Sequence, residues 1–299
     1  MTRKKILIFG ISTSMGSNLA NFLKSDYQVI GTYSKTRVEI DGILSLGCDL
    51  TYSHTVQSII LSTLPDVIIY CSGHSSVEEC ASDHEKANFF NSDVLSRICE
   101  YSHYLNIKIC YISSMFVFAG ENKTYFEMDI PEPNTIAGKS YYAGESFLQK
   151  NYNNYIIFRT GKIYNRSINV LKPGLIDILQ RNLFNKSPTD CDNNVSMGYL
   201  DVSYLSMIIK LCIEKNATNR LFQVSSNDIM STYEFALAYC EQFNEDKSII
   251  NSRNQNFPLI NSSNRPLYFD LDISNIERFL NIKLPSINES LKFTFDRLR

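Results

Sequence analysis

Short apolar runs alternate with segments of helical periodicity through the first half of the chain. The apolar runs predict strands at residues 5–10, 27–33, 66–71, 107–113 and 155–159. The segments between them predict helices at residues 18–24, 55–64, 85–105 and 138–151. Strands without polar alternation are typical of a parallel sheet that is buried on both faces. The order predicts an α/β fold with a Rossmann-type, doubly wound parallel sheet.

The longest of these helices carries apolar residues three or four positions apart. They are Ala87, Phe90, Val94, Ile98, Tyr101 and Leu105. This spacing places them on one face of a helix, which we expect to pack on the sheet.

The alternation is less regular after residue 162. The pattern predicts helices at 175–182, 204–214, 232–243 and 288–298, with a strand at 220–224. Polar stretches at 185–194 and 251–264 predict loops. We therefore expect a dinucleotide-binding domain over residues 1–162 and a smaller, mixed, substrate-binding lobe over 163–299, with the chain free to cross between them.

Composition narrows the classes of partner. Of the 299 residues, 44% are hydrophobic and 20% are charged, which fits a globular protein with a large core. The formal net charge of -2 provides no basic field for nucleic acid or an anionic membrane, so we expect a small-molecule partner. A homodimer is left open.

Cysteine usage and the N-terminus both favour the cytoplasm. The eight cysteines are scattered without a Cys-x-x-Cys pair, which predicts reduced thiols and no metal site. The apolar run at 6–10 is too short for a signal peptide or a membrane span. We expect a cytoplasmic protein.

A glycine-containing turn follows the first predicted strand. It consists of Gly10, Ile11, Ser12, Thr13, Ser14, Met15 and Gly16, so glycine occupies both outer positions of a G-x-x-G-x-x-G pattern and threonine the middle one. Such a turn lets the backbone approach a pyrophosphate, while N–H groups at a helix N-terminus hold the anion. The motif alone is weak, but its place before repeated βα units favours a dinucleotide site over a ligand-free turn.

The end of the second predicted strand favours NADP (as NADPH) over NAD. Ser34, Lys35, Thr36 and Arg37 stand where a carboxylate would bind the ribose 2′-hydroxyl of NAD. Lys35 and Arg37 are suited instead to a 2′-phosphate. The alternative is a solvated basic loop.

Several separate stretches resemble one protein family. Residues 66–80 are similar to its fourth strand and the loop that passes the cofactor, and Asn91 falls where its next helix carries an Asn. Residues 112–120 and 159–164 resemble its I-S-T-D-Y-V-F-x-G and R-T-x-x-V-Y segments. The chain thus resembles the extended short-chain dehydrogenase/reductases, in the dTDP-4-dehydrorhamnose reductase-like branch, over nearly its whole length.

The resemblance implies a set of site residues. Ser114 takes the place of the catalytic Ser or Thr. The candidate cofactor-binding residues are Gly10, Ser12, Thr13, Ser14, Met15, Gly16, Ser34, Lys35, Arg37, Asp49, Leu50, Cys71, Ser72, Gly73 and Asn91.

The chain departs from the family at its catalytic helix. The family pattern Y-G-x-[ST]-K-x-A-G-E aligns with residues 137–145, so Ala137 occupies the tyrosine position and Tyr141 the lysine position. In the family the tyrosine protonates the carbonyl and the lysine lowers its pKa, and a positioned acid contributes roughly 10²–10⁴-fold in rate. Tyr141 is a candidate displaced acid, with packing on the cofactor as its alternative role. Lys139 lies two residues from Ala137 and points off that face.

These observations lead to one expected function and two alternatives. We expect an NAD(P)-dependent oxidoreductase acting on a nucleotide-linked sugar, specifically a 4-keto-6-deoxy-sugar reductase of O-antigen or capsule biosynthesis with non-standard catalytic residues. The alternatives are a non-catalytic homologue that binds a nucleotide or a partner protein, and a sugar-nucleotide epimerase. Fold alone does not choose among them.

Overall fold

The computed structural model describes residues 3–166, 168, 173–254, 257–260 and 266–298. At its centre is a seven-stranded sheet in the order β12-β7-β5-β4-β1-β2-β3, and every pairing between these strands is parallel. The strands are β1 (Lys5–Phe9), β2 (Gln28–Tyr33), β3 (Leu44–Gly47), β4 (Val67–Tyr70), β5 (Lys108–Ser114), β7 (Tyr155–Thr160) and β12 (Arg220–Val224). The predicted doubly wound α/β fold is confirmed.

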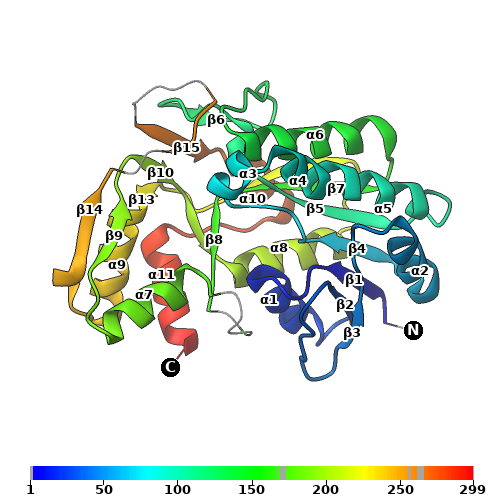
Figure 1. Ribbon diagram of the computed structural model, residues 1–299, viewed down its shortest axis with the longest axis horizontal. Coiled ribbons are helices and arrows are strands. Elements are labelled where there is room, and N and C mark those ends of the chain that lie inside the picture. Colours follow the sequence, from blue (N-terminus) through cyan, green and yellow to red (C-terminus); the bar gives the residue numbers. More distant parts are fainter. Residues whose placement is uncertain (1–2, 167, 169–172, 255–256, 261–265, 299) are drawn as a thin grey trace.

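Helices cover both faces of this sheet (Figure 1). One hydrophobic cluster includes residues of α2 (Ser53–Thr63), α5 (Val94–His103) and α6 (Ile136–Asn151). A second cluster, on the opposite face, joins α1 (Ser14–Leu23), α8 (Val202–Glu214) and α10 (Ser274–Leu280). Two-sided burial explains why the strands are apolar throughout.

The helix expected at 85–105 is interrupted by a π-helical turn. The structure has α4 (His84–Asn88), the π-helix η1 (Phe89–Asp93) and then α5, preceded by the short helix α3 (Val77–Ser82). Ala87, Val94 and Ile98 are fully buried, as expected of the apolar face. Leu105 lies beyond the helix end and is 42% exposed, so its predicted place on that face is wrong.

The remaining elements form a smaller lobe beside the sheet (Figure 1). They are η2 (Met115–Val117), β6 (Thr124–Tyr125), β8 (Lys162–Tyr164), α7 (Leu175–Phe184), β9 (Thr189–Asp192), β10 (Val195–Met197), β11 (Tyr199–Asp201), β13 (Met230–Ser231), α9 (Thr232–Phe243), η3 (Lys247–Ile249), β14 (Ile250–Arg253), β15 (Leu267–Leu271) and α11 (Ile287–Leu298). Two elements after residue 162 belong to the central part of the fold: β12 pairs with β7 in the sheet, and α8 packs beside α1.

Two predicted loops contain strands. β9 lies inside the stretch 185–194, and β14 begins just before the stretch 251–264 and continues into it. The two strands pair in parallel. Residues 255–256 and 261–264 of the second stretch lie outside the described residues.

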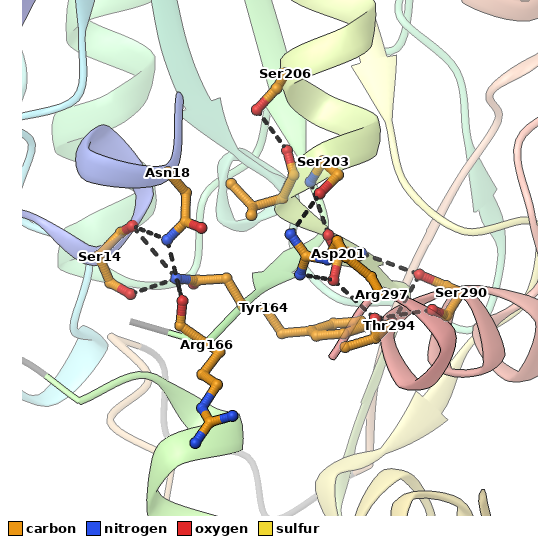
Figure 2. Close-up of polar contacts among 12 residues, drawn as sticks. Ser14, Asn18, Tyr164, Arg166, Asp201, Ser203, Ser206, Ser290, Thr294 and Arg297 are labelled. Carbon is orange, nitrogen blue, oxygen red and sulfur yellow. Dashed lines mark hydrogen bonds and ion pairs between the residues drawn. The ribbon is translucent and has the colours of Figure 1, made fainter. Parts of the chain in front are cut away.

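A buried polar network fastens α11 to β11 and β8 (Figure 2). The fully buried Asp201 carboxylate accepts hydrogen bonds from Thr294 Oγ1 at 2.7 Å and Arg297 Nη2 at 2.9 Å. Tyr164 donates to Ser290 Oγ at 2.8 Å, and Ser290 Oγ also accepts the Asp201 N–H. The C-terminal helix is therefore held by specific bonds as well as by apolar packing.

In the described part of the chain, no helix combines the length and the apolar character needed to cross a membrane.

Candidate active site

The glycine turn lies at the point where the strand order reverses. From β1 the chain moves outward through β2 and β3, then returns to place β4 on the other side of β1. Gly10 has φ of +98°, and a Cβ built there would lie 2.6 Å from Ser72 Oγ in the loop after β4. A Cβ on Gly16 would overlap the Gly10 carbonyl oxygen. Both glycines are thus required sterically, and the turn occupies the crevice where open α/β sheets bind ligands.

Thr13 stands where the pattern has its middle glycine, and its side chain caps the N-terminus of α1. Its hydroxyl accepts the Gly16 N–H at 2.9 Å and donates to the Gly10 carbonyl at 2.8 Å. The cap stabilises the strand-to-helix turn. Ser14, Met15 and Gly16 form the first turn of α1, where backbone N–H groups have no partner within the helix. The close backbone approach and the helix N-terminus fit a dinucleotide pyrophosphate.

A segment of the smaller lobe reaches the same turn (Figure 2). Asn165 Nδ2 donates to Ser14 Oγ at 2.6 Å. Asn18 Nδ2 donates to the backbone oxygens of Ser14 at 2.9 Å and Arg166 at 3.2 Å. The start of α1 is therefore braced by the residues that follow β8.

The basic loop after β2 is exposed. Ser34, Lys35 and Arg37 all reach solvent, and Arg37 forms an exposed ion pair with Glu39 at 3.4 Å. Lys35 lies near Asp49, whose pKa is lowered by hydrogen bonds from Thr51 and further by the Lys35 charge. Two predicted cofactor-site positions, Lys35 after β2 and Asp49 after β3, therefore lie at the same edge of the sheet.

Three further predicted positions differ in burial. The Leu50 side chain belongs to the core. Ser12 and Met15 are partly exposed, and Met15 packs against the second hydrophobic cluster.

The loop after β4 is held by Asn91. This fully buried residue of η1 accepts the His74 N–H at 2.6 Å and donates to the His74 carbonyl and to Ser140 Oγ. Cys71, Ser72 and Gly73 are partly exposed in this loop. The side-chain amide of Asn91 thus bonds both to the loop after β4 and to α6, and holds that loop in place between the glycine turn and α6.

Ser114 ends β5 beside a buried ion pair. Its neighbour Ser113 donates to Glu145 Oε1 at 2.6 Å, and Arg159 Nη2 donates to Glu145 Oε2 at 2.7 Å. Glu145 and Arg159 are 0% and 3% exposed. The pair joins α6 to the ends of β5 and β7, and so fixes the partly exposed Ser114, whose hydroxyl accepts the Phe116 N–H at 3.3 Å.

The position of the family's tyrosine is closed by packing. Ala137 is fully buried in a small cluster with Val77, Cys80 and Ala87. Tyr141, one helical turn on, is 6% exposed, and a Cβ built on Gly73 would lie 3.2 Å from its hydroxyl oxygen. Tyr141 therefore faces the loop after β4. Burial raises its pKa well above the usual value of 10.0, so the phenol keeps its proton at neutral pH.

Two charged residues near this site were not among the predicted site residues. Lys162 begins β8, and Glu78 lies in the first turn of α3. They are close enough for the Glu78 charge to act on the pKa of Lys162. A lysine two residues beyond a buried strand at the carboxyl edge of the sheet is the signal that could have identified this position.

Comparisons with known proteins identify the family of this chain. The family model described as RmlD substrate binding domain matches residues 4–299. The chain belongs to this family. The dTDP-4-dehydrorhamnose reductase of Aggregatibacter actinomycetemcomitans is 23% identical over 96% of this chain and 97% of that protein. The methionine adenosyltransferase 2 subunit beta of Bos taurus is 22% identical over 92% of this chain and 82% of that protein.

Among solved structures, the dTDP-4-dehydrorhamnose reductase from Bacillus anthracis, determined in complex with NADP, superimposes with a TM-score of 0.84. It is 23% identical, and the match covers 99% of this chain and 100% of that one. The resemblance seen in the sequence is confirmed at the level of family and fold.

Proposed function

We propose that this RmlD-family protein is a cytoplasmic, NADPH-dependent reductase of a nucleotide-linked 4-keto-6-deoxy sugar that serves surface-polysaccharide assembly. The observation that carries the proposal is that Gly10 and Tyr141 both adjoin the loop after β4, while Ser114 ends the neighbouring strand β5. Family membership and the named reductase relatives support the reaction class.

The chain's own residues would divide the work as follows. Gly10, Gly16 and the start of α1 hold the pyrophosphate, and Lys35 with Arg37 contacts the 2′-phosphate. When bound, the reduced nicotinamide supplies hydride. Ser114 donates a hydrogen bond to the carbonyl oxygen of the sugar. Tyr141, with its raised pKa, adds a hydrogen bond in this site or packs on the cofactor.

The test is NADPH oxidation followed at 340 nm with a panel of nucleotide-linked keto sugars. We expect turnover by the wild type and a loss of about 10²-fold or more in kcat for Ser114→Ala. NADPH binding by the variant, measured by fluorescence, should stay within threefold of the wild type. Turnover unaffected by Ser114→Ala would contradict the proposed role.

A non-catalytic role is the second candidate, and the closed packing around Ala137 favours it. One relative bears the name of an enzyme subunit, methionine adenosyltransferase 2 subunit beta. This candidate predicts NADPH binding without oxidation across the whole sugar panel.

A further inference from the structure

Lys162 follows the carboxyl end of β7, the strand that pairs with Ser114 of β5. β7 ends at Thr160, whose partner in β5 is Ser114. A Cβ on the intervening Gly161 would lie 2.7 Å from the Gly198 carbonyl oxygen, and the Lys162 N–H donates to that oxygen at 2.8 Å. This close approach fixes the backbone, so Lys162 lies two residues beyond the strand partner of Ser114.

The Lys162 side chain is open to solvent beyond the carboxyl end of β7. Its side chain is exposed, yet the surrounding protein desolvates it and lowers its pKa from the usual 10.5. Within the residues that the structure describes, its Nζ atom forms no hydrogen bond or ion pair. An exposed ammonium without a bonded partner among the described residues is available to a ligand.

Among the described residues, Glu78 is the charged group that acts on the pKa of Lys162. Glu78 of α3 attracts the ammonium and opposes the fall in its pKa. On the paired strand β11, Asp201 is bonded to Arg297, and the Tyr199 hydroxyl is bonded to Thr232. Glu78 is therefore the charged group from these two elements that acts on Lys162.

The same helix links Lys162 to the missing tyrosine. Val77, the residue before Glu78, belongs to the same buried cluster as Ala137. The start of α3 thus lies near the family's tyrosine position, and the Glu78 charge acts on Lys162.

We propose that Lys162 donates the proton to the carbonyl oxygen of the nucleotide-linked keto sugar, in place of the tyrosine that Ala137 has replaced. This rests on the proposed reductase function. The carbonyl carbon accepts a hydride from a reduced nicotinamide dinucleotide, and the C=O π pair moves to oxygen. That oxygen takes a proton from the Lys162 ammonium. The product is an alcohol, and the neutral amine regains its proton from water.

The kinetic test uses Lys162→Met, Lys162→Arg and a matched surface control, Lys139→Met. We expect Lys162→Met to lower kcat about 10²–10⁴-fold, the contribution of a positioned acid, with NADPH affinity within threefold of the wild type. Arginine retains the charge but does not release a proton near neutral pH, so Lys162→Arg should not restore turnover. Lys139 is exposed on α6, so Lys139→Met should keep kcat within twofold of the wild type. Full activity of Lys162→Met or rescue by arginine would overturn the assignment as acid.

The proposal predicts the direction in which kcat/KM changes with pH. Because the protonated amine is the acid, kcat/KM of the wild type should fall as pH rises through the pKa of Lys162, below 10.5. The corresponding alkaline limb should be absent in Lys162→Met. An unchanged profile would count against the proposal. If the wild type itself reduces no keto sugar, the proposed function is wrong, and the proton transfer from Lys162 is wrong with it.

A second measurement does not depend on turnover. Limited acetylation with acetic anhydride across a pH series, quantified by peptide mass spectrometry, compares Lys162 with Lys139 in the same sample. We expect Lys162 to react at lower pH than Lys139 and to be protected at least fivefold by a dTDP-linked sugar, with Lys139 unprotected. Identical pH dependence and no protection would place Lys162 outside the site.

Discussion

At the scale of single residues, the chain has both outer glycines of the turn after β1, and has Ala137 and Tyr141 where the resemblance places a catalytic tyrosine and lysine. Gly10 and Gly16 are required by steric contacts, whereas Ala137 fills its position without any polar group. The substitution was visible in the sequence. The packing of Val77, Cys80 and Ala87 against it was not, since these contacts depend on how α3 and α4 meet α6.

Restoring the tyrosine should therefore destabilise the protein. In Ala137→Tyr, the ring has no space in a fully buried cluster, so we expect a loss of about 1–3 kcal/mol in the free energy of unfolding. Urea denaturation measures it, with Ala143→Ser on the same helix as the control. A variant as stable as the wild type with increased turnover would show that the site is open.

The buried ion pair of Arg159 and Glu145 should contribute more to the free energy of unfolding than an exposed ion pair does. Arg159→Met leaves the Glu145 carboxylate buried without its cation, and we expect a loss of about 3–5 kcal/mol in the free energy of unfolding. Arg253→Met removes an exposed pair with Asp190 and should cost about 1 kcal/mol or less. Equal effects in chemical denaturation would contradict the burial described here.

At the scale of elements, the central strands were predictable because burial on both faces leaves a continuous apolar signal. β3, β9 and β14 were missed because they carry polar or exposed residues at sheet edges. The π-turn at Phe89–Asp93 was also missed, since its sequence continues a helical pattern. Of the candidate site, the glycine turn followed from local sequence and Ser114 from the family resemblance. The position of Lys162 after a buried strand was visible in the sequence, but its relation to Ser114 depends on the pairing of β5 with β7.

The cap of α1 provides an element-scale prediction. Thr13→Ala removes the oxygen that accepts the Gly16 N–H, so we expect a loss of about 0.5–2 kcal/mol in the free energy of unfolding. Thr13→Ser retains that oxygen and should remain within about 0.5 kcal/mol of the wild type. Equilibrium unfolding of the three proteins measures the difference. An alanine variant as stable as the serine variant would mean that the cap contributes nothing.

At the scale of the whole molecule, the smaller lobe contacts the helices of the sheet at the start of α1. Asn165 bonds to Ser14 there, and within the lobe the Asp201 network holds α11 against β11 and β8 (Figure 2). The glycine turn and Lys162 therefore lie near the join between the two parts. We propose two roles for this region: the glycine turn binds a dinucleotide, and Lys162, outside the family's catalytic pair, donates the proton.

The most direct test of this account is a fluorescence titration of the wild type with NADPH and with NADH. We predict saturable binding of both, tighter for NADPH. Replacing Lys35 and Arg37 by alanine together should weaken NADPH about tenfold, equivalent to about 1.4 kcal/mol, and leave NADH unchanged. Failure of the wild type to bind either nucleotide would contradict the central claim that the turn from Gly10 to Gly16 is a dinucleotide site.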